Sequence, residues 1–329
     1  MIALLLIPFA LAAVFGISSI VDNELEEEAQ RIADNNGLGD FDPDAPSIFD
    51  GTEVQVGDNE ANTLSGGAGT DVLFGFGQTD VLDGGAGPDV LDGGTNADTL
   101  SGGAGDDILG GGRGTDLLSG DAGNDLLLGD NGDDTLFGGD GNDTLIGGGD
   151  LDALSGGAGD DLLISGVLRF DATDEDLNVS ATAARAIGLF GQGDISDADI
   201  EALRSGGAFN GVDIRFLDEP PNPPQGGTLD GGLGNDTLFL TGGDTAVGGA
   251  GVDQFVLGDD LLGARTVFIT DYAADEDLIT LEHDGDVSDL DVRDRGEDAV
   301  IFLGDDVIAQ ITGAAGLTVA DINLVTRAA

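Results

Sequence analysis

Between Gly57 and Ile164 the chain is a tandem repeat of twelve units, each nine residues long and all in one register. Position 1 is Gly and position 8 is Leu in every unit, whereas position 6 is Asp in eleven units and Asn62 in the first. A unit with one large apolar side chain buries too little to fold alone, so the units must stack on one another. The period therefore predicts a solenoid with a continuous row of leucines inside it.

Each unit divides into a polar part and an apolar part. Positions 1 to 6, such as GGDGND at residues 138–143, are rich in Gly and Asp, which favour tight turns. We expect these six residues to form the turn, with a left-handed backbone at position 4, where Gly is the usual residue. Positions 7 to 9, such as Thr144-Leu145-Ile146, suit a short strand whose central Leu points inward.

The repeats resemble those of a known family. The units GGAGTDVLF (66–74), GGAGDDILG (102–110) and GGDGNDTLI (138–146) are similar to the nonapeptides of RTX, or hemolysin-type calcium-binding, proteins. The resemblance implies an all-β fold, a parallel β-roll in which G-G-x-G-x-D forms the turn, x-U-x forms a short strand and two units complete one turn of the roll. It also implies several bound Ca²⁺ ions and a secreted protein.

The aspartates at position 6 are the candidate calcium ligands. With two units per turn they alternate between two edges, and neighbours along an edge lie about one strand spacing, roughly 4.8 Å, apart. Ca²⁺ accepts six to eight oxygen ligands, whereas Mg²⁺ prefers a smaller shell, so Ca²⁺ is the better candidate. The first edge holds Asp71, Asp89, Asp107, Asp125, Asp143 and Asp161, and the second holds Asn62, Asp80, Asp98, Asp116, Asp134 and Asp152.

The charge of the repeats agrees with a row of cations on each edge. Residues 57–164 contain 22 acidic residues and Arg113, a net charge of −21. Six turns leave five gaps on each edge, so ten Ca²⁺ ions on two edges would supply +20, close to neutrality. The alternative is that the aspartates are only solvated turn residues, but position 6 is fixed while position 5 varies, with Thr, Pro, Ala, Asp and Asn among its residues.

The two edges are not expected to be equal. Position 4 departs from Gly in four units, at Glu60, Gln78, Asn96 and Asp150, and all four lie on the second edge. We therefore predict a well-formed calcium row on the first edge. The row on the second edge should be weaker and best formed around Asp116 and Asp134.

The composition of the whole chain excludes several classes of protein. The net charge is −55 and there is no Lys, which argues against nucleic-acid binding. There is no Cys, so disulfides, thiolate metal sites and a Cys nucleophile are excluded. A hydrophobic content of 40% exceeds that of a disordered acidic tail, so neutralisation by cations is the better explanation of the charge.

The N-terminal part of the chain has a different character. Residues 2–21 are uncharged and apolar, and the segment 1–21 is interpreted as a hydrophobic helix that anchors the chain in a membrane, as a cleaved signal peptide or as a buried helix. An acidic linker, 22–56, follows. A cell-surface or extracellular location in a bacterium is expected, with membrane contact only through residues 2–21.

Beyond the twelve units the period is lost and then resumes. Residues 165–225 form a non-repeat insert with one predicted helix, 196–204, and a stiff linker, 220–224. A second repeat block, 226–258, contains Asp236 and Asp253, which are 17 residues apart and expected to share a Ca²⁺ ion. The remaining region, 259–329, is predicted as a β-rich cap with strands at 278–281, 299–303 and 307–311. Its likeness to the closing region of RTX exoproteins implies a C-terminal signal for type I secretion, although the apolar N-terminus departs from that plan.

No motif in the sequence indicates catalysis. The single histidine, His283, has no nucleophile-elbow partner and is expected on a surface turn, and the H-E-x-x-H zinc motif is absent. The preferred hypothesis is a non-enzymatic calcium-binding protein with a role in adhesion or matrix interaction, whose insert contacts a cell-surface or matrix partner. The alternative is an accessory module or small enzyme acting on an extracellular polymer, with its activity in residues 165–225.

Overall fold

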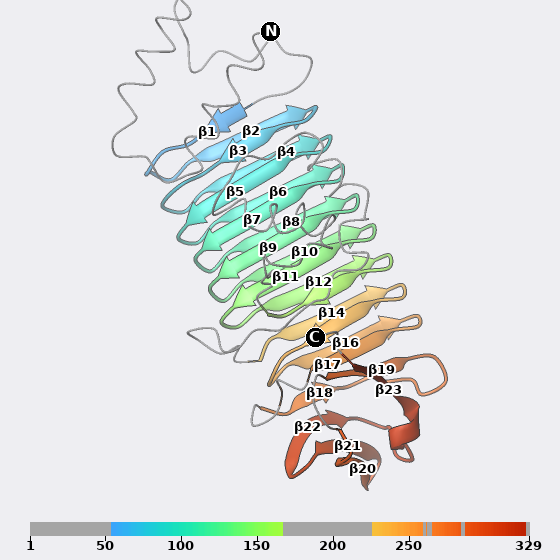
Figure 1. Cartoon of the computed structure of the whole chain (residues 1–329). Coiled ribbons are helices and arrows are strands. Elements are labelled where there is room, and N and C mark those ends of the chain that lie inside the picture. The colour runs from blue at the N-terminus through green and yellow to red at the C-terminus, as the bar shows by residue number, and fades with distance from the viewer. Residues whose placement is uncertain (1–53, 167–225, 259–260, 262–264, 284–286, 327–329) are drawn as a thin grey trace, which may run out of the picture.

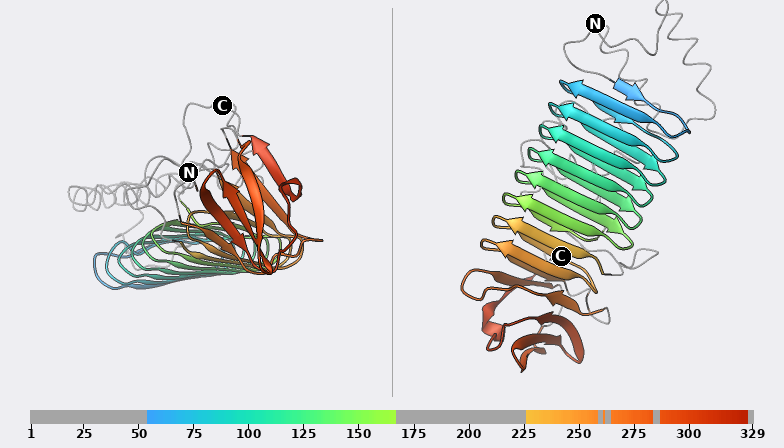
Figure 2. Two further views of the ribbon diagram at one scale, coloured as in Figure 1. Left: turned by 90° about the horizontal axis from the view of Figure 1, so that it is seen from below. Right: turned by 180° about the vertical axis from the view of Figure 1, so that it is seen from behind.

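The protein is a parallel β-solenoid made of two facing sheets (Figure 1). The computed structural model describes residues 54–166, 226–258, 261, 265–283 and 287–326. From β1 to β19 successive strands alternate between the sheets, and each strand pairs in parallel with the strand two places along the chain (Figure 2). The described residues thus have the all-β, parallel solenoid architecture that the repeat predicts.

The strands of the first sheet, called sheet I, are β1 (Val54–Val56), β3 (Val72–Phe74), β5 (Val90–Thr95), β7 (Ile108–Arg113), β9 (Leu126–Asn131), β11 (Thr144–Gly149), β13 (Leu162–Ile164), β15 (Thr237–Leu240), β17 (Gln254–Gly258), β19 (Leu278–His283) and β23 (Ile322–Thr326). Those of sheet II are β2 (Thr63–Ala68), β4 (Val81–Ala86), β6 (Thr99–Ala104), β8 (Leu117–Ala122), β10 (Thr135–Asp140), β12 (Ala153–Ala158), β14 (Thr228–Leu233), β16 (Thr245–Ala250), β18 (Val267–Ile269), β22 (Asp306–Ile311), β21 (Asp298–Leu303) and β20 (Leu290–Arg295). One 3-10 helix, η2 (Val319–Asp321), precedes β23.

The register of the sheets confirms two nonapeptides per turn. Leu64 pairs with Leu82 in sheet II, and Leu73 pairs with Leu91 in sheet I, each pair 18 residues apart. The position-8 leucines from Leu73 to Leu163 are all buried and form one core between the sheets, and Leu64 packs against that core. The predicted leucine row is therefore the interior of the solenoid.

The strands are longer than the sequence predicted. We expected three-residue strands and six-residue turns, but β4 and most others are six residues long and include positions 1 to 3 of the following unit. The turn proper shrinks to positions 4 to 6. The reason lies at position 1, where a Cβ on Gly84 would sit 2.6 Å from both Asp89 Oδ2 and the carbonyl oxygen of Gly102. Gly is needed at position 1 for close packing inside a strand, not for turning the chain.

Position 4 has the predicted left-handed backbone in ten of the twelve units. Gly69 has a φ of +125°, and the residues that replace Gly on the second edge, Gln78, Asn96 and Asp150, keep positive φ values of 71–78°. Such a backbone costs an L-residue roughly 1–2 kcal/mol. The second edge therefore carries backbone strain that the glycines of the first edge avoid.

The non-repeat insert interrupts a single turn of an otherwise continuous solenoid. Strand β14 pairs with β12, and β15 pairs with β13, so the two repeat blocks share both sheets. Ala153 and Thr228 are paired although they are 75 residues apart, and a normal turn takes 18, which leaves 57 inserted residues. The predicted helix 196–204 and linker 220–224 lie outside the described residues, as do residues 2–21. The described part of the chain contains no helix long and apolar enough to cross a membrane.

The C-terminal strands extend the two existing sheets. The predicted strands at 278–281, 299–303 and 307–311 are present as β19, β21 and β22. In sheet II, β18 pairs in parallel with β22, which continues into the antiparallel pairs β22–β21 and β21–β20. In sheet I, β23 pairs with β19. The sequence analysis did not predict β20 and β23.

His283 does not lie on a surface turn, so that expectation was wrong. It ends β19 and is buried, because its backbone pairs with Thr326 of β23, a strand 43 residues further along the chain. The local sequence Leu281-Glu282-His283-Asp284-Gly285 does not indicate that a distant strand pairs with this segment.

Candidate metal centre

Two rows of turns line the long edges of the solenoid. Edge 1 consists of the turns that lead into sheet I, such as the one between β2 and β3, and edge 2 consists of the turns that lead into sheet II. The position-6 aspartate is the last residue of its turn and immediately precedes a strand. All thirteen predicted ligands are at most 4% exposed. They are Asp71, Asp80, Asp89, Asp98, Asp107, Asp116, Asp125, Asp134, Asp143, Asp152, Asp161, Asp236 and Asp253.

One oxygen of each aspartate after Asp71 belongs to a ladder of hydrogen bonds along the edge. The backbone N–H of Asp71 donates to Asp89 Oδ1 at 2.6 Å, and the N–H of Asp89 donates to Asp107 Oδ1 at 2.7 Å. On edge 1 this pattern continues without a break to Asp277. On edge 2 it runs from Asn62 to Asp152. The ladder fixes the direction of every carboxylate.

The second oxygen of most of these aspartates lacks a donor. The Oδ2 atom is buried and accepts no hydrogen bond in ten residues of the described chain, which are Asp80, Asp98, Asp107, Asp116, Asp125, Asp134, Asp143, Asp152, Asp161 and Asp236. Burying an ionised carboxylate without a partner costs several kcal/mol, so proteins pair such groups or use them to bind metals. This buried Oδ2 atom without a hydrogen-bond donor, repeated along both edges, is the feature that indicates cation binding.

The electrostatics of the rows lead to the same conclusion. Burial raises the pKa of these carboxyls, and repulsion from neighbouring carboxylates adds to the rise, while the ladder hydrogen bond partly opposes it. From a usual value of 3.8, the pKa rises to about 6 for Asp143 and Asp161, to about 7 for Asp98, Asp107, Asp152 and Asp236, and to about 8 for Asp125 and Asp134. Positive charge between the turns would reverse this shift.

Backbone carbonyls complete the oxygen-rich environment. A Cβ on Gly85 would overlap the carbonyl oxygen of Gly67, and a Cβ on Gly87 would overlap that of Gly69, so the carbonyls of positions 2 and 4 point at the next turn. In the described residues no three His, Cys, Asp or Glu side chains gather as a metal cluster. A site between turns would thus combine aspartates of successive turns with carbonyl oxygens, a donor set that suits Ca²⁺.

Two acidic residues that end the rows were not predicted from the sequence. Asp277 ends the edge 1 ladder, where Oδ1 accepts from Asp253 N–H at 3.1 Å and Oδ2 from Ala273 N–H at 2.7 Å. Asp244, on edge 2, accepts from Gly227 N–H at 2.7 Å and from the Ser165 hydroxyl at 2.6 Å. Both immediately precede a strand, which is the signal that could have identified them. Unlike the row members, each has protein donors on both oxygens.

Position 5 also forms a ladder that was not anticipated. On edge 1, Asn124 N–H donates to Asp106 Oδ1 at 2.8 Å, and the same bond recurs down the edge through Asn142, Asp160 and Asn235 to the N–H of Val252. Variation at position 5 concealed this role, because Asp and Asn serve it equally well. Edge 1 thus carries two ladders over this stretch.

Edge 2 is interrupted where the insert returns. Gly227 immediately precedes β14, in the place of the position-6 aspartate, and the ladder therefore stops at Asp152. Together with the strained position-4 residues, this break makes edge 2 less regular than edge 1. The number of ions on each edge stays a prediction.

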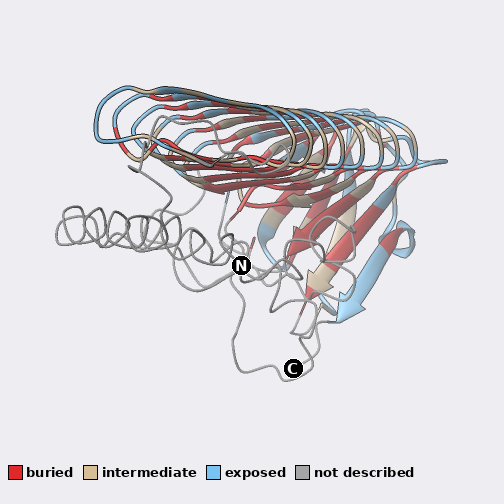
Figure 3. Cartoon of the chain, turned by 90° about the horizontal axis from the view of Figure 1, so that it is seen from above, coloured by how far each residue is buried: buried red, intermediate tan, exposed pale blue. Residues whose placement is uncertain are grey.

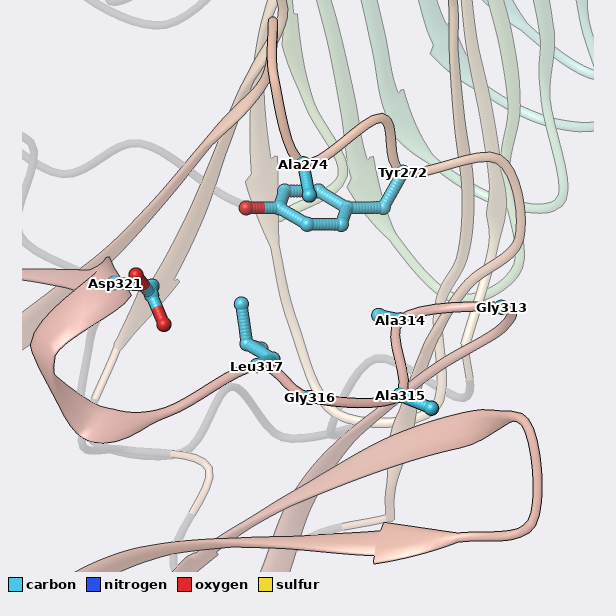
Figure 4. A pocket seen from close by; sticks show the side chains of 8 residues that line it. All are labelled: Tyr272, Ala274, Gly313, Ala314, Ala315, Gly316, Leu317 and Asp321. Carbon is cyan, nitrogen blue, oxygen red and sulfur yellow. The ribbon is translucent and has the colours of Figure 1, made fainter.

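A separate cavity of about 280 Å³ lies near the C-terminal end (Figure 4). Its lining is formed by Tyr272, Ala274, Gly313, Ala314, Ala315, Gly316, Leu317 and Asp321. Burial raises the pKa of Tyr272, whereas hydrogen bonds from Thr318 lower that of Asp321. With one carboxylate and one phenol among mostly small residues, this cavity does not resemble the carboxylate rows.

Comparison with known proteins identifies the repeats. A family model described as the RTX calcium-binding nonapeptide repeat matches residues 56–91, 92–127, 128–163 and 228–245. These segments belong to the RTX repeat family. The match covers the first repeat block and the second block as far as Thr245, the first residue of β16. No curated protein matches the chain.

One solved structure aligns with this chain at low overall similarity. The crystal structure of extracellular lipase LipA from Serratia marcescens aligns with 75% of this chain at 15% identity and a TM-score of 0.22. The aligned part is 40% of the length of that lipase.

Proposed function

We propose that this protein is a calcium-binding RTX protein of the bacterial exterior, secreted or held at the cell surface, whose solenoid folds when Ca²⁺ binds. The observation that carries the proposal is the repeated, buried and donor-free Oδ2 atom along both edges. Each carboxylate is already aimed by its ladder bond, so a cation between turns needs little reorganisation of the side chains.

Calcium supplies the free energy that the metal-free chain lacks. A net charge of −55 opposes compaction, and the rows place carboxylates one strand spacing apart inside the protein. Because the sites exist only between stacked turns, the free energy of binding is free energy of folding. The extracellular modules that bind calcium have a Kd of about 10⁻⁴–10⁻³ M, so the roll would be expanded in a calcium-poor cytosol and folded outside the cell.

The biological role that fits best is non-catalytic, in adhesion or in matrix interaction. The described residues are accounted for by the solenoid and its ladders. The insert leaves and re-enters the roll at a single turn of edge 2, which is a suitable place for a partner-binding element on a rigid scaffold. An accessory or enzymatic role would require activity in that insert.

The proposal is tested by circular dichroism of the full chain during a calcium titration that starts from excess chelator. We expect a cooperative gain of β signal near millimolar Ca²⁺, and Mg²⁺ at the same concentrations should not reproduce it. A β spectrum that is already complete in chelator would refute calcium-driven folding. Isothermal titration calorimetry on the same sample would then show whether any calcium binds.

A further inference from the structure

The outer faces of the two sheets differ sharply in character. Positions 7 and 9 point away from the leucine core, and in sheet I they carry large apolar side chains. Seven of these are at most 7% exposed and lie outside the core cluster, namely Phe74, Ile108, Leu126, Leu128, Ile146, Ile164 and Val256. In sheet II, Leu117 and Phe137 occupy the same positions and are 42% and 45% exposed. The layers also differ in Figure 3, where buried residues gather on one side of the solenoid.

An apolar outer face of this size needs a cover. The seven residues lie on β3, β7, β9, β11, β13 and β17, so they form a strip down sheet I that is interrupted at β5 and β15. Soluble proteins rarely expose contiguous apolar patches larger than a few hundred Å², and larger ones mark interaction surfaces. The matched positions on sheet II are mostly Thr and Ser, as in Thr99 and Ser101, which need no such cover.

The position of the insert favours it as the cover. The chain leaves sheet I directly after Ile164, the last residue of β13 and itself a member of the strip. Strand β13 lies within the strip, with β3 to β11 on one side and β15 and β17 on the other. The 57 extra residues therefore start on the surface that has to be covered.

The composition of the insert also fits. Residues 167–225 contain 16 Val, Leu, Ile and Phe residues, which can supply apolar side chains to the strip. They also hold four of the ten arginines, although 11 acidic residues leave the segment negative overall. The strip contains the acidic residues Asp92 and Asp130, and burial followed by the charge of Asp130 raises the pKa of Asp92 to about 7. An arginine from the insert would neutralise this local charge.

We propose that the outer face of sheet I is the docking surface for residues 167–225 of the same chain. The insert is then held as a layer on one face of the solenoid, and the outer face of sheet II and edge 1 stay open. Because sheet I exists only in the folded roll, calcium also controls where the insert is presented. A partner that recognises the docked insert would bind only the calcium-loaded protein.

Photo-crosslinking of the full, calcium-loaded chain identifies the occupant directly. The chain has no cysteine, so L128C offers a single thiol on the strip and L117C offers a matched thiol on sheet II. Each thiol is labelled with a benzophenone maleimide in chelator and denaturant, where it is accessible, before the chain is refolded in calcium. We expect L128C to cross-link to peptides from 167–225 and L117C not to do so. Cross-links from L128C to residues 1–53, to an isotopically labelled second copy, or to nothing would overturn the proposal.

Removal of the insert gives an independent test. Replacing residues 167–225 by Ala-Gly leaves Ser165-Gly166-Ala-Gly-Gly226-Gly227 ahead of Thr228, which restores a nine-residue unit. In calcium the L128C thiol should lose its protection from maleimide and react as fast as the L117C thiol, which should be unchanged. Persistent protection of L128C in this variant would show that something else covers the strip. If the shortened chain does not fold in calcium, the cross-linking result decides.

Discussion

Replacing Asp134 by Asn should stabilise the calcium-free roll and weaken its binding of calcium. Asp134 is 1% exposed, and its Oδ1 accepts the backbone N–H of Asp116 at 2.8 Å. Asn can keep that hydrogen bond through its own Oδ1. Its amide group takes the place of the donor-free Oδ2, on the side of Gly129 that also faces the carbonyl oxygen of Gly147. The substitution therefore exchanges a buried charge for a neutral donor.

The magnitude follows from the pKa of Asp134. Burial raises this pKa from 3.8 to about 8. Each pH unit between 3.8 and 7.5 then costs the metal-free fold about 1.4 kcal/mol, so this group alone disfavours the metal-free fold by up to about 5 kcal/mol at pH 7.5. For an acid with a raised pKa, the folded state binds more protons than the unfolded state between these values. The stability of the metal-free roll is thus fully present below pH 3.8 and is lost as the pH rises towards 8.

The assay is circular dichroism in excess chelator from pH 4 to pH 9. The unsubstituted chain should gain β signal on acidification, and D134N should shift this transition to higher pH. In calcium at pH 7.5, D134N should need a higher Ca²⁺ concentration to fold, because one charged ligand is gone.

The matched control is D133N, which removes the same charge one residue away. Asp133 is exposed, and Asn there can still accept the backbone N–H of Leu151. We expect D133N to follow the unsubstituted chain closely in both titrations. Equal effects of D133N and D134N would mean that net charge alone governs folding. A calcium-free D134N less folded than the unsubstituted chain would refute the claim that burial of the carboxylate is what opposes folding.

Three further predictions concern single residues. G84A should destabilise the calcium-loaded protein by about 3 kcal/mol and lower its melting temperature accordingly, because the added Cβ would meet Asp89 Oδ2 and a backbone carbonyl. G67A should cost only about 1 kcal/mol, since only its positive φ is unfavourable. Equal melting temperatures of the two variants would contradict the packing role of position 1. Q78G should raise the stability of the loaded roll to urea by about 1 kcal/mol by relieving a φ of 71°, and a loss would show that the Gln78 side chain matters more than the strain. D277A should raise the Ca²⁺ concentration at the midpoint of folding, because it removes the end of the edge 1 ladder and leaves the Asp253 N–H without its acceptor. An unchanged midpoint would show that the ladder end is dispensable.

The candidate site could be located from sequence because its residues recur at a fixed interval. A period of nine with Asp at position 6 places the carboxylates on two edges whatever the details of the strands, and the structure brings the predicted first-edge residues from Asp71 to Asp161 into one ladder with Asp236 and Asp253. The residues that end the rows, Asp244 and Asp277, could not be predicted because they lie outside the regular period. They are recognisable only by the strands that follow them.

The length of the strands could not be read from residue types. Gly-Gly at positions 1 and 2 predicts a turn by local preference, yet Gly84 and Gly85 continue β4, because pairing with the neighbouring turns outweighs the low strand propensity of glycine. Likewise, the burial of His283 depends on β23, which no local pattern joins to β19. Interactions between distant segments decided both features.

The sequence by itself determined the solenoid, its leucine core and the two rows of aspartates, since a strict repeat forces every unit into the same environment. Only the tertiary structure decided which aspartate oxygen is tied into a ladder and which is left for a cation. It also decided that the insert occupies one turn of edge 2, and that sheet I, unlike sheet II, buries its outer face. These features depend on how a turn meets the next turn and on what packs against the sheet, and neither is encoded within a single nonapeptide.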